Sequence, residues 1–252
     1  MLITIFIADI PFRFTYIPFL KFIYCFIRLH PDMKHRYFNF KNQHLWLSPE
    51  RTIYWEDEKA LILSDSHFGK TGHFRKSGVP VPQNVFLEDL QRLFNLLQFY
   101  KPKKLIVVGD LFHSKSNKEH LLFEKWRNDF AELNVLLVKG NHDILPRDWY
   151  EQTKINVFDD RPLKIHAFAF THDYMNIEKF PQHTDAYFFT GHLHPGIFIK
   201  GKSRQSLRFP CFYFTQQFAV LPAFSKFSGL ALIDKKKTDS VFAIVNDELL
   251  EM

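Results

Sequence analysis

The stretch VLLVKGNHDILP, residues 135–146, joins an apolar run to three polar residues in succession. The run at 135–138 is typical of a buried strand, and Gly140 allows the backbone to turn tightly. The amide of Asn141, the imidazole of His142 and the carboxylate of Asp143 follow at once. These groups bind metals or move protons, so we interpret the stretch as a core strand that opens into a functional loop.

Apolar runs of the same kind precede this strand and alternate with amphipathic segments. The pattern predicts strands at 44–47, 52–55, 60–63 and 105–108, and helices at 84–99 and 118–132. Strands that alternate with helices form parallel sheets with crossover connections. The first half of the chain therefore predicts an α/β arrangement.

The second half of the chain is rich in short strands separated by turns. We predict strands at 164–170, 186–190, 196–200, 207–214, 230–234 and 240–245. No linker or internal repeat is evident. We therefore expect a single domain of two packed sheets with helices outside.

Five of the predicted strands end in short polar motifs. These are Asp65-Ser66-His67, Gly109-Asp110, Gly140-Asn141-His142-Asp143, Thr171-His172 and Gly191-His192-Leu193-His194. Ligands of open α/β sheets bind beyond the carboxyl ends of the strands, where loops that are distant in sequence converge. We therefore expect the five motifs to meet.

These motifs offer oxygen and nitrogen donors and no thiolate. The donor set suits divalent manganese, iron or zinc and argues against a cysteine-based structural zinc site. Seven residues are candidate ligands: Asp65, His67, Asp110, Asn141, His172, His192 and His194. Seven are too many for one tetrahedral ion and suit two ions that share a carboxylate. Two ions about 3.5–4 Å apart can hold a bridging hydroxide and the non-leaving oxygens of a phosphate.

Each motif alone also has a structural explanation. A histidine at a strand end is commonly a polar residue that meets solvent, and Thr171-His172 or Asp65-x-His67 alone is a weak pattern. The GNHD motif at 140–143 with GHLH at 191–194 downstream is a much rarer coincidence. In this order the motifs together favour the metal site.

Composition is compatible with several partners. The 252 residues carry a formal net charge of +6, which suits a nucleic acid and equally suits ordinary solubility. The two cysteines, Cys25 and Cys211, argue against a disulfide framework and fit a reducing compartment, so we expect a cytoplasmic protein.

The N-terminal residues 1–29 are strongly apolar, but charged residues and prolines interrupt them. A spanning helix needs about 20 nearly uncharged residues, and a secretory signal ends in small residues at a cleavage site. Neither pattern is present. We expect the functional domain to occupy 33–252, beginning at Met33, and residues 1–32 to be an upstream translation or a dispensable extension. A membrane-associated extension is the alternative, and no stable membrane association is expected.

The ordered motifs D-x-H, G-D, G-N-H-D, H and G-H-x-H resemble the signature of the calcineurin-like metallophosphoesterases. The resemblance spans 65–194 and implies a four-layer αββα sandwich, in which two mixed β-sheets are flanked by helices. It also implies that Asp65, His67 and His194 hold one ion and that Asn141, His172 and His192 hold the second. Asp110 would bridge both.

A closer resemblance covers nearly all of the chain from Met33. The segments LILSDSHFGKTGHFRKSGVPVP, GDLFHS, GNHD, GHLHPG, SLRFPCF and LPAFSKFSG are similar to the bacterial DNA-ligase-associated metallophosphoesterases. This family implies an ATP-dependent DNA ligase, a helicase and an exonuclease-like protein as partners. The string GDLFH at 109–113 also resembles the superfamily's double-strand-break repair nucleases, so His113 is a candidate catalytic residue, although many relatives have Asp there.

Chemical roles can now be suggested for the residues of the loop at 140–143. His142 would point past the ions toward the leaving group and protonate it or stabilise the developing charge. Asp143 would hydrogen-bond His142 and favour its protonated form. The alternative for Asp143 is a contact that only stabilises the loop.

Basic residues follow the first and last metal motifs. The predicted substrate-binding residues are Lys70, Arg75, Lys76, Arg204 and Arg208. They form a basic rim if both groups line the mouth of the site, and a solvated face otherwise.

The sequence therefore predicts a metal-dependent phosphoesterase with two ions, manganese being expected and iron or zinc being alternatives. We expect a DNA endonuclease or phosphodiesterase in repair. A small-nucleotide phosphodiesterase or phosphatase is the first alternative, and a non-catalytic repair scaffold is the second.

Overall fold

The computed structural model describes residues 34–70, 84–113, 118–183, 185–200 and 206–252. The extension at 1–32 and the predicted boundary at Met33 lie outside these residues, as do Arg75, Lys76 and Arg204. In the described part of the chain, no helix has the length and apolar character that crossing a membrane requires.

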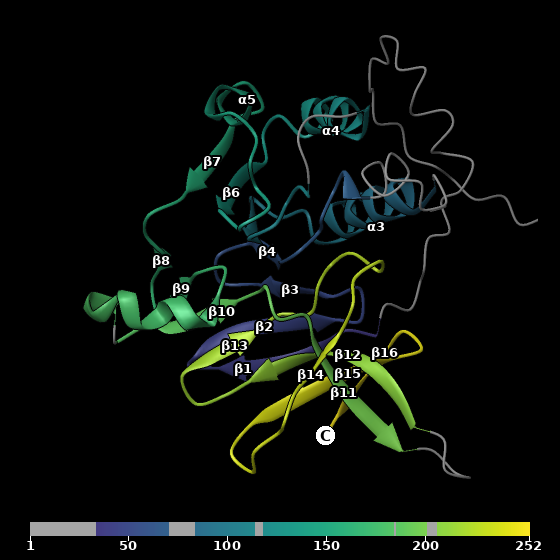
Figure 1. The fold of residues 1–252 in the computed structure, drawn as a ribbon, viewed down its shortest axis with the longest axis vertical. Helices are drawn as coiled ribbons and strands as arrows, with labels where there is room; N and C mark the ends of the chain where they lie inside the picture. The colour runs from purple at the N-terminus through teal and green to yellow at the C-terminus, as the bar shows by residue number, and fades with distance from the viewer. Residues whose placement is uncertain (1–33, 71–83, 114–117, 184, 201–205) are drawn as a thin grey trace, which may run out of the picture. The chain divides into compact units, whose positions relative to one another are not determined.

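The first sheet has the spatial order β1-β2-β3-β4-β5-β6-β7 (Figure 1). Its strands are β1 (Arg36–Phe40), β2 (Gln43–Ser48), β3 (Thr52–Trp55), β4 (Ala60–Leu63), β5 (Lys104–Val108), β6 (Asn134–Val138) and β7 (Ile155–Phe158). The strands β1 to β4 pair antiparallel, and β4 to β7 pair parallel. The sheet is therefore mixed, and its parallel half brings the carboxyl ends of β4, β5 and β6 to one edge.

The apolar runs of β4, β5 and β6 arise because both faces of this half-sheet are covered. Along β4, Ile62 packs between the two sheets, whereas Leu61 and Leu63 face the helices. The helical cover consists of α3 (Asn84–Tyr100), α4 (Lys118–Asp129) and α5 (Arg147–Gln152). Alternate side chains thus enter two separate cores, as period-2 geometry requires.

The second sheet has the order β14-β11-β12-β13-β10-β9-β8, with β15 beside β12 and β16 beside β15. Its strands are β8 (Leu163–Ile165), β9 (Phe168–Phe170), β10 (Tyr187–Thr190), β11 (Pro195–Lys200), β12 (Ser206–Phe214), β13 (Phe218–Val220), β14 (Ala231–Leu232), β15 (Ser240–Val245) and β16 (Glu248–Glu251). The strands β9, β10 and β13 run parallel, and β12 pairs antiparallel with its neighbours. This sheet is also mixed.

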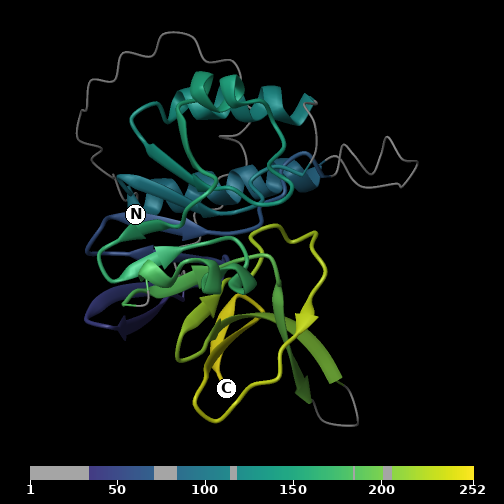
Figure 2. The same cartoon turned by 60° about the vertical axis from the view of Figure 1, so that its left-hand side comes forward.

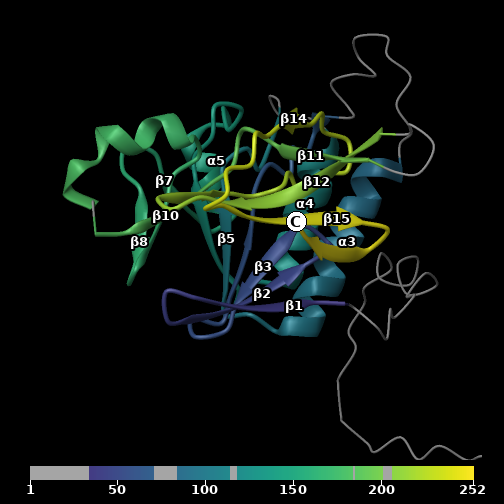
Figure 3. The same cartoon turned by 90° about the horizontal axis from the view of Figure 1, so that it is seen from below.

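The two sheets pack face to face through aromatic side chains. Phe38 of β1 contacts Phe214 and Phe242, with ring centroids 5.0 and 5.1 Å apart. Figure 2 shows the helices on one side of the paired sheets, and Figure 3 shows β1 to β3 in purple beside β15 in yellow. On the second sheet, Tyr174 of the 3-10 helix η1 (Tyr174–Lys179) stacks on Phe218. The predicted α/β fold with two mixed sheets and outer helices is confirmed.

One predicted strand is divided in the structure. The segment 164–170 forms the antiparallel pair β8 and β9, because the chain reverses at His166, whose φ is 50°. Several short or edge elements were not predicted, namely β1, β7, β13, β16 and α5. Each of them is only three to six residues long, which leaves little periodicity to detect.

Candidate metal centre

The seven candidate ligands lie at neighbouring strand ends of the two sheets. Asp65 and His67 follow β4, Asp110 follows β5, Asn141 follows β6, His172 follows β9, and His192 and His194 follow β10. A parallel bridge between residues 64 and 223 and several loop hydrogen bonds join the two sheets at this edge. The convergence expected from the strand ends is therefore present.

The first cluster consists of Asp65, His67 and His194. The Nε2 atom of His194 lies 3.4 Å from Asp65 Oδ1 and 3.3 Å from His67 Nε2. Asp65 and His67 are buried, and His194 is half-buried. Three donor atoms thus face a common point at the inner end of the site.

The second cluster consists of Asp110, His172 and His192, with Asn141 beside it. The Nε2 atom of His172 lies 3.2 Å from both Asn141 Oδ1 and His192 Nδ1. It lies 3.6 Å from Asp110 Oδ2. Asn141 and His192 are exposed, so this cluster opens to solvent.

Asp110 stands between the two clusters. Its Oδ2 atom lies 3.9 Å from Nδ1 of His67 in the first cluster, in addition to its approach to His172 in the second. Its Oδ1 atom accepts a hydrogen bond of 2.9 Å from the backbone N–H of His142. A carboxylate in this position can serve both halves of a two-ion site.

The donor chemistry fits a pair of divalent ions. Imidazole nitrogens of His67 and His194, and of His172 and His192, face each other at 3.3 and 3.2 Å. Nδ1 of His67 is buried without a hydrogen-bond partner among the described residues. Buried polar atoms rarely lack partners, and nitrogen and oxygen donors with shared carboxylates suit manganese, iron or zinc. The two clusters therefore fit a binuclear site.

Backbone strain is concentrated at these ligands. Five of them have positive φ: Asp65 (51°), His67 (48°), Asp110 (49°), His192 (63°) and His194 (51°). A non-glycine residue in this left-handed region costs energy that the surrounding structure must offset. The hydrogen bonds that hold these strand ends include Asp65 N–H to Gly109 O at 3.1 Å and His67 N–H to Asp110 O at 2.9 Å.

Three glycines allow the ligand segments to approach one another. A Cβ atom added at Gly109 would overlap the ring of His172, and one added at Gly140 would overlap Asp110. At Gly191, an added Cβ would lie 2.5 Å from Oδ2 of Asp65. Each glycine of the strand-end motifs thus makes room for a ligand from another strand.

Asp143 holds the loop rather than the imidazole of His142. Its side chain is fully buried, Oδ1 accepts from Phe112 N–H at 3.0 Å, and Oδ2 accepts from Gly140 N–H at 2.9 Å. Burial raises the pKa of Asp143 to about 7, against the effect of these two hydrogen bonds. Among the described contacts there is none from Asp143 to the His142 ring. This corrects the expected pairing and supports the loop-stabilising alternative.

Burial also acts on the pKa values of Asp65, Asp110 and His67. Burial acts to raise the pKa of Asp65, but the His194 hydrogen bond and three nearby imidazoles bring it below its ordinary value. Burial raises the pKa of Asp110. Burial also lowers the pKa of His67 to about 2, which keeps this imidazole neutral and able to ligate a metal.

The two candidate catalytic histidines lie side by side. The rings of His113 and His142 have centroids 4.3 Å apart, and they lie 5.3 and 5.7 Å from the ring of His67. Both are half-buried. The pair therefore borders the first cluster.

The described members of the predicted basic rim differ in position. Lys70 is half-buried, and its backbone N–H donates to His67 O at 3.1 Å. Burial lowers the pKa of Lys70, while Asp110 and Asp65 act to raise it. Arg208 is exposed on β12, with its guanidinium 5.1 Å from the centroid of the Phe198 ring. Lys70 is thus at the site, whereas Arg208 lies on the β11–β12 hairpin.

Sequence reasoning missed the loop that covers the end of β4. Phe224 N–H donates to Ser64 O at 2.8 Å, and Ser225 N–H donates to Asp65 O at 3.2 Å. Arg51 donates to the carbonyls of Ala223 and Ser225 at 3.1 and 2.8 Å. The only available signal was the segment LPAFSKFSG, which contains this loop.

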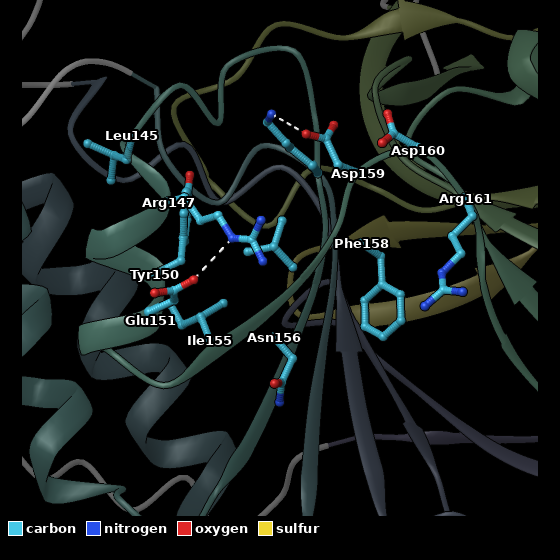
Figure 4. A pocket seen from close by; sticks show the side chains of 12 residues that line it. Leu145, Arg147, Tyr150, Glu151, Ile155, Asn156, Phe158, Asp159, Asp160 and Arg161 are labelled. Carbon is cyan, nitrogen blue, oxygen red and sulfur yellow. Dashed lines mark hydrogen bonds and ion pairs between the residues drawn. The ribbon is translucent and has the colours of Figure 1, made fainter.

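A cleft of about 860 Å³ lies beside the loop that carries Asn141 and His142 (Figure 4). Its lining includes two ion pairs, Lys139–Asp159 at 2.5 Å and Arg147–Glu151 at 3.0 Å. None of the seven candidate ligands lines it. The cleft is therefore separate from the metal centre.

Comparisons with known proteins agree with this geometry. The chain is similar to the solved structure of Pseudomonas putida nuclease MPE, with 28% identity, a TM-score of 0.72, and coverage of 87% of this chain and 100% of that chain. It is more distantly similar to Yfce, a phosphoesterase from E. coli, with 13% identity, a TM-score of 0.40, and coverage of 74% of this chain and 88% of that chain. No curated protein matches. Residues 58–200 match the family described as calcineurin-like phosphoesterase, and the chain belongs to that family.

Proposed function

We propose that the chain hydrolyses phosphodiester bonds with two divalent ions and that its substrate is DNA under repair. The observation that carries the proposal is the position of Asp110, whose carboxylate lies between two clusters of nitrogen and oxygen donors. Asp65, His67 and His194 would hold one ion, and Asn141, His172 and His192 would hold the other, with manganese expected in both positions.

The ions, when bound, would neutralise charge on the phosphate and activate water. Side chains of the protein would position the loop and supply the proton. Asp110 orients the histidine loop through the N–H of His142, and Asp143 ties that loop to the end of β5 through Phe112. His142 would donate a ring proton to the leaving oxygen, and His113 would lie against it as a second imidazole.

The exposure of the second cluster to solvent supports a polymeric substrate. Asn141 and His192 are exposed, so a strand could lie across the second cluster without being enclosed. Lys70 supplies a cation next to the first cluster, and the formal net charge of the chain is +6. The similarity to a nuclease supports the same substrate class. We propose that the protein acts in the cytoplasm, with a DNA ligase, a helicase and an exonuclease-like protein as its partners.

The test is hydrolysis of labelled single-stranded, nicked and gapped DNA by the full chain in the presence of manganese. The Asp110→Asn protein, prepared identically, excludes a contaminating nuclease. We expect cleavage by the parent and at least a hundredfold less by the variant, since misplaced groups cost about that factor. Turnover of small nucleotide esters without DNA cleavage would favour the small-nucleotide phosphodiesterase. No turnover of any ester by metal-loaded parent would favour the scaffold.

A further inference from the structure

The loop at the end of β4 is fixed by a buried ionic network. Its three successive carbonyls, at residues 223–225, accept hydrogen bonds from Arg51 and Arg92. Arg92 is buried, pairs with Asp89 at 3.1 Å and Glu50 at 3.4 Å, and lies 4.0 Å from the centroid of the Phe224 ring. Two guanidinium groups thus determine where this loop runs.

The network extends to the residues that follow. Asp89 accepts hydrogen bonds from the hydroxyl of Ser225 and the N–H of Lys226. The Ser225 hydroxyl oxygen in turn accepts from the N–H of Phe227 at 3.2 Å. The backbone is therefore held up to Phe227, although this side chain is 42% exposed.

Phe227 shares a small hollow with the metal centre. The residues that line the hollow include Phe227, Ser225, His67 and Lys70. Phe227 therefore borders a space that His67 of the first cluster also borders. Lys70 borders the same space, and the exposed Lys226 precedes Phe227 in the loop.

We infer that Phe227 forms a stacking subsite for the nucleobase adjacent to the scissile phosphate, an inference that rests on the proposed function. An aromatic ring held by a rigid backbone stacks on any base, because every base has a π-face. Lys70 and Lys226 would contact the neighbouring phosphates. The Arg51–Arg92 network holds the backbone of the loop that carries this ring.

The experiment compares two esters with the same leaving group in the full chain with manganese. Thymidine 5′-(p-nitrophenyl phosphate) carries a base, and methyl p-nitrophenyl phosphate does not. The readout is the ratio of kcat/KM for the first ester to kcat/KM for the second. The variants are Phe227→Leu, Phe227→Tyr and, as a matched exposed phenylalanine at the far end of α3, Phe99→Leu.

We expect the ratio to fall about tenfold in Phe227→Leu, equivalent to about 1.4 kcal/mol, within the range of base–aromatic stacking. Phe227→Tyr, which keeps the ring, should retain the parent ratio, as should Phe99→Leu. An unchanged ratio in Phe227→Leu, or an equal fall in Phe227→Tyr, would overturn the stacking subsite. Failure of the parent to hydrolyse either ester would instead overturn the proposed function.

Discussion

At the scale of single residues, Gly140 shows how closely the site is packed. A Cβ atom added there would overlap both Oδ1 and the backbone nitrogen of Asp110. We predict that Gly140→Ala displaces Asp110 by a fraction of an ångström or more and lowers kcat at least about a hundredfold, because small misplacements cost that much. Steady-state kinetics with manganese and the metal content of the purified variant provide the measurement.

Gly229 offers the control for this substitution, since an added Cβ there meets nothing within 4 Å. Gly229→Ala should keep parental kcat and metal content. Parental activity in Gly140→Ala would show that the two strand ends are not in fixed contact.

The role proposed for His142 depends on the leaving group. If its ring donates a proton, His142→Gln should lower kcat on DNA by about 10²–10⁴, the usual contribution of a general acid. A p-nitrophenyl ester needs little protonation of its leaving group, so its loss should be much smaller. Equal losses on both substrates would refute proton donation, and metal analysis of the variant would show whether ligation has suffered instead.

His120 provides a prediction about pH. Its side chain is 0% exposed and stacks on Phe112 with ring centroids 4.7 Å apart. Burial lowers its pKa from 6.5 to about 4. Between these values the unfolded chain binds the proton and the folded chain does not, so the free energy of unfolding falls as pH decreases through this window. The contribution reaches about 3 kcal/mol at most.

Urea unfolding of the metal-free protein from pH 7 to pH 4 tests this contribution. The slope of unfolding free energy against pH should be smaller in His120→Gln than in the parent. The difference isolates His120 from the other histidines, which titrate in both proteins. Parallel pH profiles would contradict the lowered pKa.

At the scale of elements, the strands that are buried on both faces were predicted accurately from the sequence. The interior strands β4, β5 and β6 were predicted within one residue at each end, because both of their faces are buried and their runs are uniformly apolar. The residues of the edge strands β1 and β7 are mostly exposed or half-buried. For them, the pairing partner rather than the local sequence determines the strand.

The site was predictable to the extent that its chemistry lies in side chains at strand ends. The seven candidate ligands could be selected by residue type, and the structure brings them together. The partners of Asp143 could not be predicted, because both are backbone N–H groups and one of them lies 31 residues away. Arg51 and Arg92 contact loop carbonyls 172 and 132 residues later, a relation that no local pattern contains.

The Arg92 network also predicts a stability effect. Arg92→Met leaves the buried Asp89 and the half-buried Glu50 without this partner, and breaking a buried ion pair in this way costs about 3–5 kcal/mol. The midpoint of thermal unfolding should fall by roughly 6–20 °C, given about 2–4 °C per kcal/mol for a domain of this size. Calorimetry or circular dichroism measures it.

Arg147 is the matched control, because its ion pair with Glu151 lies on the surface and its side chain is 90% exposed. Arg147→Met should change the unfolding free energy by no more than about 0.5 kcal/mol. A similar small change in Arg92→Met would mean that the buried network does not hold the loop.

At the scale of the whole molecule, the candidate ligands come from both sheets, so bound ions would add to the packed faces and the loop hydrogen bonds that join the sheets. Ions that bind the folded chain and not the unfolded chain stabilise it by about 2.7 kcal/mol at a hundredfold excess over Kd. Removing them with EDTA should therefore lower the unfolding midpoint by about 5–10 °C. Differential scanning calorimetry with and without manganese tests this, and Asp110→Asn should show a smaller shift. Identical midpoints in the parent would contradict a two-ion site that spans both sheets.

The distance between the ligands along the chain has a consequence for biosynthesis. His67 and His194 meet in the first cluster although 127 positions separate them. A ribosome adds about 5–20 residues per second, so about 6–25 s pass between the synthesis of the two. During that interval Asp65 and His67 exist on a nascent chain whose second sheet is still incomplete, since β8, β9 and β10 are made only towards its end. A chain released before β10 is made lacks His192 and His194, one proposed ligand of each ion. We therefore expect metal loading to be a late event in the life of each new molecule.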